Sequence, residues 1–266
     1  MTRIGMFAGL AAAALLAACS NEQGTEPVTE GTASREAAPE VEAVVFENNE
    51  LRGERSREFA YNWPAEVTAV PALVERFAAE RNALLAEQKQ DFEDALREFE
   101  GSDCLACTNR SFAKQWEVVA DLPRFLSLSQ SFSAYTGGAH GNAGSGALVW
   151  DREAGQALAP ADFFASEQAL QDALGSRWCT LLRAERSRRL GEDPGDGGIF
   201  PCPPIKDLTV LLGSEGRSHF DRIGLIADPY VAGSWAEGAY EVTIPVSAPL
   251  IAALKPEYRA YFAAPK

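Results

Sequence analysis

Two long amphipathic segments dominate the pattern of apolar and polar positions. In residues 71–99, apolar side chains recur at spacings of three and four, and Pro71 suits the first turn of a helix. Residues 167–190 repeat this spacing with Leu and Trp side chains. Each segment therefore predicts a helix with one buried face. The mixed charges on the other face of the first segment indicate a solvated surface.

Shorter apolar or alternating runs predict strands before, between and after the helices. The predicted strands are residues 43–50, 55–63, 113–120, 124–135, 147–151, 208–212, 217–226 and 240–246, with a glycine-rich turn over 136–146 and a short helix over 248–254. Strands and helices are grouped rather than strictly alternating. We therefore predict an α+β fold, in which a mixed, mainly antiparallel sheet packs against the long helix and the second helix.

The N-terminal residues predict a sorting signal. Arg3 precedes an apolar run, Ile4 to Ala18, which as a helix spans roughly 22 Å and is too short for a comfortable bilayer crossing. The run ends Leu-Ala-Ala-Cys, which resembles the bacterial lipobox. That resemblance implies a signal peptide over residues 1–18 and a lipid on Cys19; the alternative is a plain secretory signal that leaves Cys19 free.

Residues 19–42 are rich in Glu, Gly, Ser, Thr and Pro and poor in large apolar side chains. Such a segment cannot offset its ordering entropy by burial, so we expect a flexible acidic tether. The expected location is the bacterial cell envelope, with the protein lipid-anchored and facing the periplasm. Ser20, rather than Asp, after the lipid cysteine slightly favours the outer membrane.

Four further cysteines are consistent with an exported protein, because an even number can pair fully in an oxidising compartment. They are Cys104, Cys107, Cys179 and Cys202. We expect the pairs Cys104–Cys107 and Cys179–Cys202. The CxxC spacing of the first pair is also found in redox couples and in half of a zinc site. No second CxxC or nearby His pair supports zinc, and we expect no metal and no cofactor.

The net charge of −14, from 24 basic and 38 acidic side chains, argues against a nucleic-acid partner, which requires a basic surface. Five arginines nevertheless crowd the end of the second helix. They are Arg177, Arg183, Arg186, Arg188 and Arg189. Cations there complement the helix dipole, and the alternative is docking to an anionic surface.

The most unusual stretch is YTGGAHGN, Tyr135–Asn142, where glycines permit backbone angles closed to other residues. Backbone N–H groups and the His140 imidazole could converge on an anion or a glycan hydroxyl. Alternatively, the stretch is a tight strand connection in which His140 hydrogen-bonds a neighbouring backbone group. Catalytic signals are weaker: Ser145 lacks the GxSxG context of a nucleophile elbow, and Glu237 is the first candidate for a glycosidase carboxylate.

Together with the residues after it, this stretch resembles a bacterial envelope family. The chain here reads YTGGAHGN, then a strand, a turn with Gly155 and the sequence ADFF. This order is similar to the pattern Y-x-GGAHG…D-x-x-x-G…L-x-D-L-F of a domain of unknown function. That domain is found at the C-terminus of the anti-sigma factor RsiV and beside the deacetylase domain of PdaC. Residues 223–254 resemble the end of that domain, with Asp228, Pro229 and Tyr230 in matching places.

The resemblance implies a PdaC-like upstream α+β domain over residues 43–133 and an RsiV-like domain over residues 134–266. We recognise no attached deacetylase domain and no transmembrane or sigma-binding segment, so neither PdaC's metal chemistry nor RsiV's signalling is implied. What the resemblance does imply is a mixed fold, an envelope location and, by analogy, binding of an envelope protein or a glycan. RsiV's domain recognises lysozyme, a basic protein, and an acidic body attracts basic partners.

We therefore predict a binding protein without catalysis that recognises an envelope protein, such as a lysozyme, or a peptidoglycan-derived ligand. Glycines and aromatic rings that offer a stacking surface mark the ligand site. These candidates are Tyr135, Gly137, Gly138, His140, Gly141, Asp228, Tyr230 and Trp235. The alternatives are a lysozyme-inhibitor-like defence lipoprotein and an envelope glycan or ester hydrolase.

Overall fold

The computed structural model describes residues 41–191 and 199–265. Residues 40–266 form one compact unit. The expected signal peptide at 1–18, Cys19 and nearly all of the tether at 19–42 lie outside the described residues. Within the described part, no helix combines the length and apolar character needed to span a bilayer.

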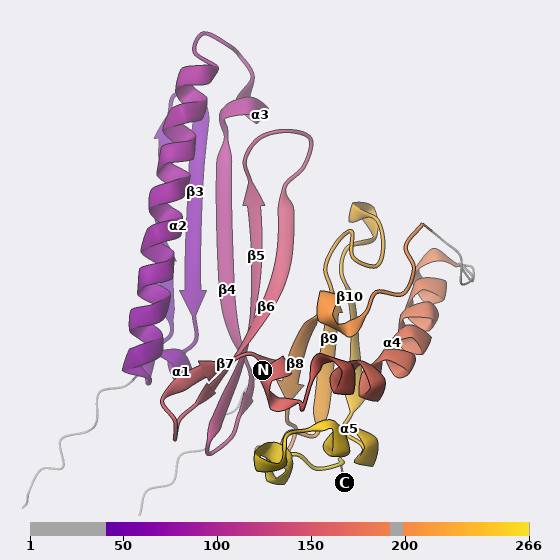
Figure 1. Ribbon diagram of the computed structural model, residues 1–266. Coiled ribbons are helices and arrows are strands. Elements are labelled where there is room, and N and C mark those ends of the chain that lie inside the picture. Colours follow the sequence, from indigo (N-terminus) through magenta and orange to yellow (C-terminus); the bar gives the residue numbers. More distant parts are fainter. Residues whose placement is uncertain (1–40, 192–198, 266) are drawn as a thin grey trace, which may run out of the picture. The chain divides into compact units, whose positions relative to one another are not determined.

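The larger of two sheets is built from the first part of the described chain (Figure 1). Among the described residues, its strands follow the order β1-β3-β4-β5-β6-β7, and β2 also pairs with β3. The pair β3–β4 is parallel and the others are antiparallel. A parallel pair needs a long crossover, which the helices between β3 and β4 supply. The strands are β1 (Val44–Glu47), β2 (Glu50–Arg52), β3 (Arg55–Trp63), β4 (Arg110–Asp121), β5 (Phe125–Tyr135), β6 (Asn142–Asp151) and β7 (Gln156–Leu158).

One face of this sheet packs against α2 (Pro71–Glu98), which lies between the short helices α1 (Ala65–Thr68) and α3 (Leu105–Thr108). The core is aromatic: the Phe77 ring of α2 stacks on Trp116 of β4 at a centroid distance of 4.3 Å. Alternate residues of β5 belong to this core, including the fully buried Leu126 and Leu128. Ser127 between them, and Ser129 and Ser131 farther along the strand, therefore point to the opposite face of the sheet.

The second half of the chain forms a smaller antiparallel sheet in the order β10-β9-β8. Its core contains apolar side chains of α4, among them Leu174, Trp178 and Leu182. Helix α4 begins after the capping residue Ser166 and is followed by the C-terminal cap Gly191, which has a φ of 78°. The elements are η1 (Pro160–Phe163), α4 (Glu167–Leu190), η2 (Ile205–Asp207), β8 (Thr209–Gly213), β9 (Arg222–Ala227), η3 (Trp235–Glu237), β10 (Tyr240–Pro245), α5 (Ala248–Ala253) and η4 (Pro256–Tyr261).

The predicted α+β class, the mainly antiparallel sheet and both long helices are confirmed. The glycine-rich turn is shorter than predicted, because β6 begins at Asn142 rather than at residue 147. Gly144 and Gly146 lie inside this strand, where a Cβ atom would come within 2.6 Å and 2.5 Å of the Phe132 and Gln130 side chains. The predicted domain boundary after residue 133 falls within β5, and residues on both sides of it pair with β6.

Both expected cysteine pairs lie at bonding distance, Cys104 with Cys107 and Cys179 with Cys202. The Cα atoms are 5.3 Å apart in the first pair and 5.6 Å in the second. The second pair links α4 to the segment before η2, across a sequence separation of 23. It restrains a much longer loop than the first pair, whose separation is 3.

Replacing both Cys179 and Cys202 by Ala is expected to lower the free energy of unfolding by about 3 kcal/mol, because the unfolded chain regains the entropy of a long open loop. Urea unfolding of the oxidised protein measures this loss. The double replacement of Cys104 and Cys107 is the matched control and is expected to cost less. Equal losses in the two variants would contradict the loop-length argument.

A second prediction concerns Asp151, whose side chain is buried at the end of β6. Arg124 donates to its carboxylate at 2.7 Å, and the backbone N–H groups of Glu153 and Ala154 also donate to it. The Arg124 hydrogen bond is the main cause that lowers the pKa of Asp151. A carboxyl group with a lowered folded-state pKa contributes stability above its unfolded pKa, and this contribution is lost as the pH falls through the folded-state value.

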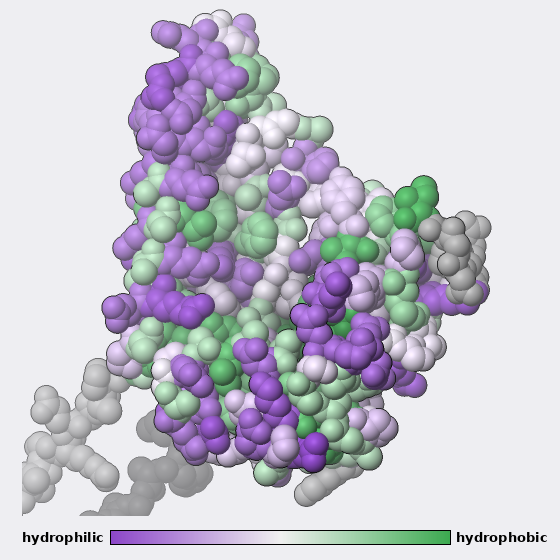
Figure 2. Space-filling model, viewed as in Figure 1, coloured by the Kyte–Doolittle hydropathy of each residue, from purple (hydrophilic) through white to green (hydrophobic). Residues whose placement is uncertain are grey.

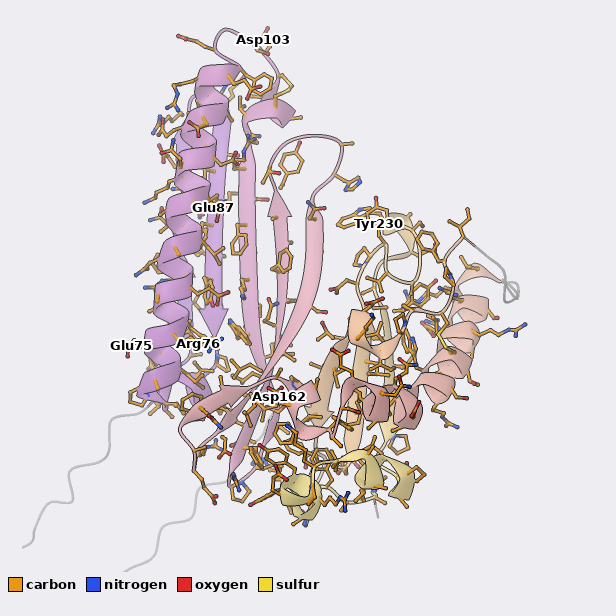
Figure 3. The ribbon with its side chains drawn as sticks, viewed as in Figure 1. Glu75, Arg76, Glu87, Asp103, Asp162 and Tyr230 are labelled. Atoms are coloured by element: carbon orange, nitrogen blue, oxygen red, sulfur yellow. A yellow bond between two sulfur atoms is a disulfide. The ribbon has the colours of Figure 1, made fainter. Side chains whose placement is uncertain are left out.

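Below about pH 4, the unfolding free energy falls as the pH is lowered. This fall should therefore be less steep in Asp151→Asn than in the wild type. Chemical denaturation across this pH range measures the two slopes. Asp103→Asn, which removes a carboxylate at an exposed position (Figure 3), should keep the wild-type slope. If Asp151→Asn keeps it as well, Asp151 is not a source of the acid sensitivity.

Candidate functional site

The β5–β6 turn and the segment after β9 meet at one surface. His140 comes from the turn, and Tyr230 and Trp235 come from residues 228–238. In Figure 3, Tyr230 lies in the connecting loops of the second sheet, on the side that faces the β5–β6 turn. The predicted candidates thus come from two segments that lie far apart in the sequence and close together in the fold.

The turn is held in shape by its own glycines and by Tyr135. Gly137 and Gly138 have φ angles of 98° and 97°. Residues with a Cβ atom strongly disfavour this backbone conformation. The Tyr135 hydroxyl lies 2.9 Å from the carbonyl oxygen of Ala106 and 2.8 Å from that of Gly138. Tyr135 therefore joins the turn to the Cys104–Cys107 segment and does not reach the aromatic surface.

His140 forms the backbone hydrogen bond expected of a tight strand connection and also contacts two aromatic rings. Its Nδ1 lies 2.7 Å from the carbonyl oxygen of Gly141, which can only accept, so Nδ1 carries the proton. Nε2 lies within hydrogen-bond distance of the Tyr230 hydroxyl, at 3.3 Å. The imidazole also stacks on the Trp235 ring, with centroids 4.7 Å apart and planes inclined by 17°. His140 bonds a neighbouring backbone group, as expected of a tight connection, and also joins the aromatic surface.

Asp228 links the two sheets. Its carboxylate accepts hydrogen bonds from the Ser145 backbone N–H at 3.0 Å and from the Ser145 hydroxyl at 2.8 Å. The Thr209 hydroxyl of β8 lies 2.9 Å from the same Ser145 oxygen. We call Asp228, Ser145 and Thr209 the clasp. The sequence predicts Asp228 as a ligand contact, and the structure gives its carboxylate a protein partner at each oxygen.

Tyr230 has an unusual backbone conformation for a residue with a side chain. Its φ is 73°, and its backbone N–H donates to Gly233 at 3.0 Å. The left-handed region costs an L-residue roughly 1–2 kcal/mol. Its side chain is nonetheless 54% exposed, so burial of the ring offsets little of that cost. Strain of this kind, held at an exposed aromatic residue, is a feature of binding and catalytic sites.

Two arginines of α4 hold the segment that carries Tyr230 and Trp235. The guanidinium of Arg186 is buried and donates to the Ala232 carbonyl, with Nε at 3.0 Å. Arg189 donates to the carbonyls of Glu237 at 3.0 Å and Ala239 at 2.8 Å. The arginine cluster is thus explained in part by internal contacts with this segment, in addition to the predicted complement to the helix dipole.

Glu237, the first carboxylate candidate for hydrolysis, closes a turn. One of its oxygens accepts from the backbone and hydroxyl of Ser234, and the other accepts from the Tyr240 hydroxyl at 2.5 Å. The Tyr240 hydrogen bond, followed by the Ser234 backbone bond, lowers the pKa of Glu237. Burial and the Glu237 carboxylate raise the pKa of Tyr240 to about 12. A proton donor for glycoside cleavage needs the opposite shift.

A cleft of about 690 Å³ lies between the two sheets, beside Trp235. Its walls include Ser129 and Ser131 from the open face of β5, together with Leu211 and Ile226 of the smaller sheet. Every ionisable side chain in this lining is acidic. These side chains are Glu117, Asp228 and Glu241.

The structure thus brings His140, Tyr230 and Trp235 together, with Gly141 beside the imidazole, and places Asp228 next to them in the clasp. Tyr135, Gly137 and Gly138 support the turn from its other side. The sequence singles out Ser145, Arg186 and Arg189 for other reasons and does not reveal their contacts at this site. The partners of Ser145 are more than sixty residues away along the chain, and no local pattern marks them. Among the described residues, no group of three or more His, Cys, Asp or Glu side chains is arranged to hold a metal ion.

Comparisons with known proteins agree with this fold. A family model described as deacetylase PdaC matches residues 39–143. No curated protein matches the chain. Among solved structures, a DUF3298 family protein from Pseudomonas aeruginosa is 18% identical, with a TM-score of 0.53, and the match covers 84% of this chain and 97% of the other.

A DUF3298 family member from Bacteroides fragilis is similar to the same degree. It is 19% identical, with a TM-score of 0.53 over 80% of this chain and 97% of its own. At such identities the likeness establishes the fold alone. The resemblance predicted from the motifs is confirmed: residues 39–143 match the PdaC family, and the chain has the fold of the DUF3298 proteins.

Proposed function

We propose that this protein is a lipid-anchored binding protein of the bacterial cell envelope that holds its ligand without transforming it. The ligand is an envelope protein or a peptidoglycan-derived molecule, and its site is the surface formed by His140, Tyr230 and Trp235. The observation that carries the proposal is the strained, exposed Tyr230 beside the stacked His140–Trp235 pair.

The three rings form one cluster, in which Tyr230 is tilted to the other two. The planes of Tyr230 and Trp235 are inclined by 31°, and those of His140 and Tyr230 by 36°. His140 and Trp235 stack face to face, so the tilted and exposed Tyr230 ring offers the free aromatic surface, which suits stacking against a sugar ring or an aliphatic side chain. The hydrogen bond between His140 and Tyr230 fixes the two segments against each other, so little ordering remains to be done when a ligand binds.

The acidic cleft beside Trp235 favours a partner with positive charge. Glu117 and Glu241 are exposed in its lining, and the whole chain carries a net charge of −14. A cleft lined by one sign of charge attracts and orients ligands of the other sign. Among envelope ligands, this property favours a basic protein over a neutral glycan.

The envelope location rests on the sequence and on the relatives. The lipobox-like ending at Cys19 supports lipid attachment, and the cysteine pairs at bonding distance suit an oxidising compartment. The PdaC match and the DUF3298 fold point the same way, since the family is associated with bacterial envelope proteins.

Tyr230→Gly separates binding from folding. Glycine relieves a left-handed strain of roughly 1–2 kcal/mol and adds chain entropy of about 0.5–1 kcal/mol to the unfolded state, so stability should change little. Loss of the ring should weaken binding at least about tenfold. The probes are a lysozyme and solubilised peptidoglycan fragments, titrated by calorimetry against the purified chain at low and high salt.

Leu51→Ala is the control, because it removes an apolar side chain that is 71% exposed and remote in sequence from the site. It should bind as the wild type does. Failure of the wild type to bind either probe, or a loss of stability in Tyr230→Gly as large as the loss of binding, would refute the proposal.

A second candidate, a lysozyme-inhibitor-like defence lipoprotein, is favoured by the acidic cleft. Inhibition of lysozyme turnover that disappears in Glu117→Gln/Glu241→Gln would establish it. The hydrolase alternative predicts turnover of glycan or ester substrates by the purified chain, and this turnover would have to be lost in His140→Ala or Glu237→Gln. The lowered pKa of Glu237 argues against its role as an acid.

A further inference from the structure

A second pocket lies on the other face of the large sheet, beside α2. It has a volume of about 540 Å³, which is within the range of small-molecule sites. Arg76 and Glu80 of α2, Lys114 and Trp116 of β4, Gln130 of β5 and Gly146 of β6 line it. Figure 2 shows a paler, more apolar strip over the sheet beside the hydrophilic surface of the long helix.

Gln130 is the feature that the fold does not explain. Its Oε1 is buried and has no hydrogen-bond partner among the described residues. A buried polar group without a partner costs stability, so such groups are rare in folded proteins. Gly146 makes room for this amide, because a Cβ atom there would lie 2.5 Å from Gln130 Nε2. The sequence therefore keeps an unpaired acceptor, and the space to hold it, on a residue that lines both this pocket and the cleft beside Trp235.

The charges in the pocket are opposite in sign to the protein as a whole. Lys114 is 9% exposed, and its ammonium binds the Glu80 carboxylate and lies 5.1 Å from the centre of the Trp116 ring. Arg76 is exposed and forms no ion pair or hydrogen bond with other residues in the described ranges 41–191 and 199–265. In Figure 3 it lies on the side of α2 nearer the strands. Two cations against one carboxylate leave one unit of positive charge unmatched.

We propose that this pocket binds a small carboxylate ligand that carries an N–H or O–H donor next to its charge. The carboxylate pairs with the Arg76 guanidinium, whose planar fork suits two parallel hydrogen bonds to such a group. The neighbouring donor supplies the hydrogen bond that Gln130 Oε1 lacks. A carboxylate with a neighbouring N–H or O–H donor occurs both at the C-terminus of a peptide and in a sugar acid. The proposal is independent of the function assigned to the aromatic surface.

The test uses two carboxylate probes and a neutral counterpart of each. N-acetyl-alanyl-alanine is compared with its C-terminal amide, and galacturonic acid is compared with galactose. In the full chain, with glutamine and arginine side chains labelled with nitrogen-15, millimolar carboxylate should shift the Gln130 amide and Arg76 Nε–H signals saturably. The neutral counterparts should bind about tenfold more weakly or not at all. The probe that binds identifies the peptide or the sugar source.

Arg76→Ala should weaken this binding about tenfold, while Arg97→Ala, an equal charge change at an exposed site on the same helix, should leave it unchanged. Gln130→Met tests the amide without removing charge. It should raise the melting temperature, because the unpaired acceptor is gone, and it should abolish the further rise that the probe causes in the wild type.

Three results would overturn the proposal: no saturable shift with either carboxylate, equal binding by Arg76→Ala and Arg97→Ala, or a lower melting temperature in Gln130→Met. Trp235→Ala distinguishes this pocket from the aromatic surface. It should leave carboxylate binding intact even where it abolishes binding of the lysozyme and peptidoglycan probes.

Discussion

The hydrogen bonds from Ser145 to the Asp228 carboxylate connect the two halves of this protein where its candidate site lies. Ser145 belongs to β6, beyond the short pairing with β7, so its N–H points to an open sheet edge. Asp228 follows β9 of the other sheet and accepts both the amide and the hydroxyl of Ser145. An unpaired edge invites association with other chains. The clasp supplies a hydrogen-bond acceptor for the Ser145 N–H at this edge from within the chain. It also fixes the β5–β6 turn against the segment that carries Tyr230 and Trp235.

The clasp explains why the aromatic surface can be preorganised although it comes from two segments. His140 lies only a few residues before Ser145, and Tyr230 lies two residues after Asp228. Arg186 and Arg189 hold the second segment from α4, and Tyr135 holds the turn from the Cys104–Cys107 side. The clasp, the two arginines and Tyr135 thus support an aromatic surface whose own side chains are largely not buried. These supports fix the position of the surface to which the proposed function assigns the ligand.

Local patterns predict the fold class, the long helices and most strands, because helix spacing and strand alternation are properties of neighbouring residues. They place the start of β6 too late, because Gly144 and Gly146 resemble turn residues. Their actual role is to make room for Phe132 and Gln130 on the neighbouring strand. The parallel pairing of β3 with β4 is also not foreseen, since it depends on where α2 returns the chain. His140 and Tyr230 belong to the motif and Trp235 is an aromatic candidate beside it, whereas the contacts of Ser145 and of the two arginines require the tertiary structure.

Amide hydrogen exchange at β6 is the sharpest test of whether Asp228 holds this strand edge. In β6, the N–H groups of Ala143 and Ser145 point to the same side of the strand, because alternate residues share an edge. Ser145 has the Asp228 carboxylate as its acceptor, and Ala143 serves as the internal reference. The Ser145 amide should exchange much more slowly than the Ala143 amide in the wild type, and this difference should disappear in Asp228→Ala. Equal exchange rates for the two amides in the wild type would show that the Asp228 carboxylate does not hold the edge of β6.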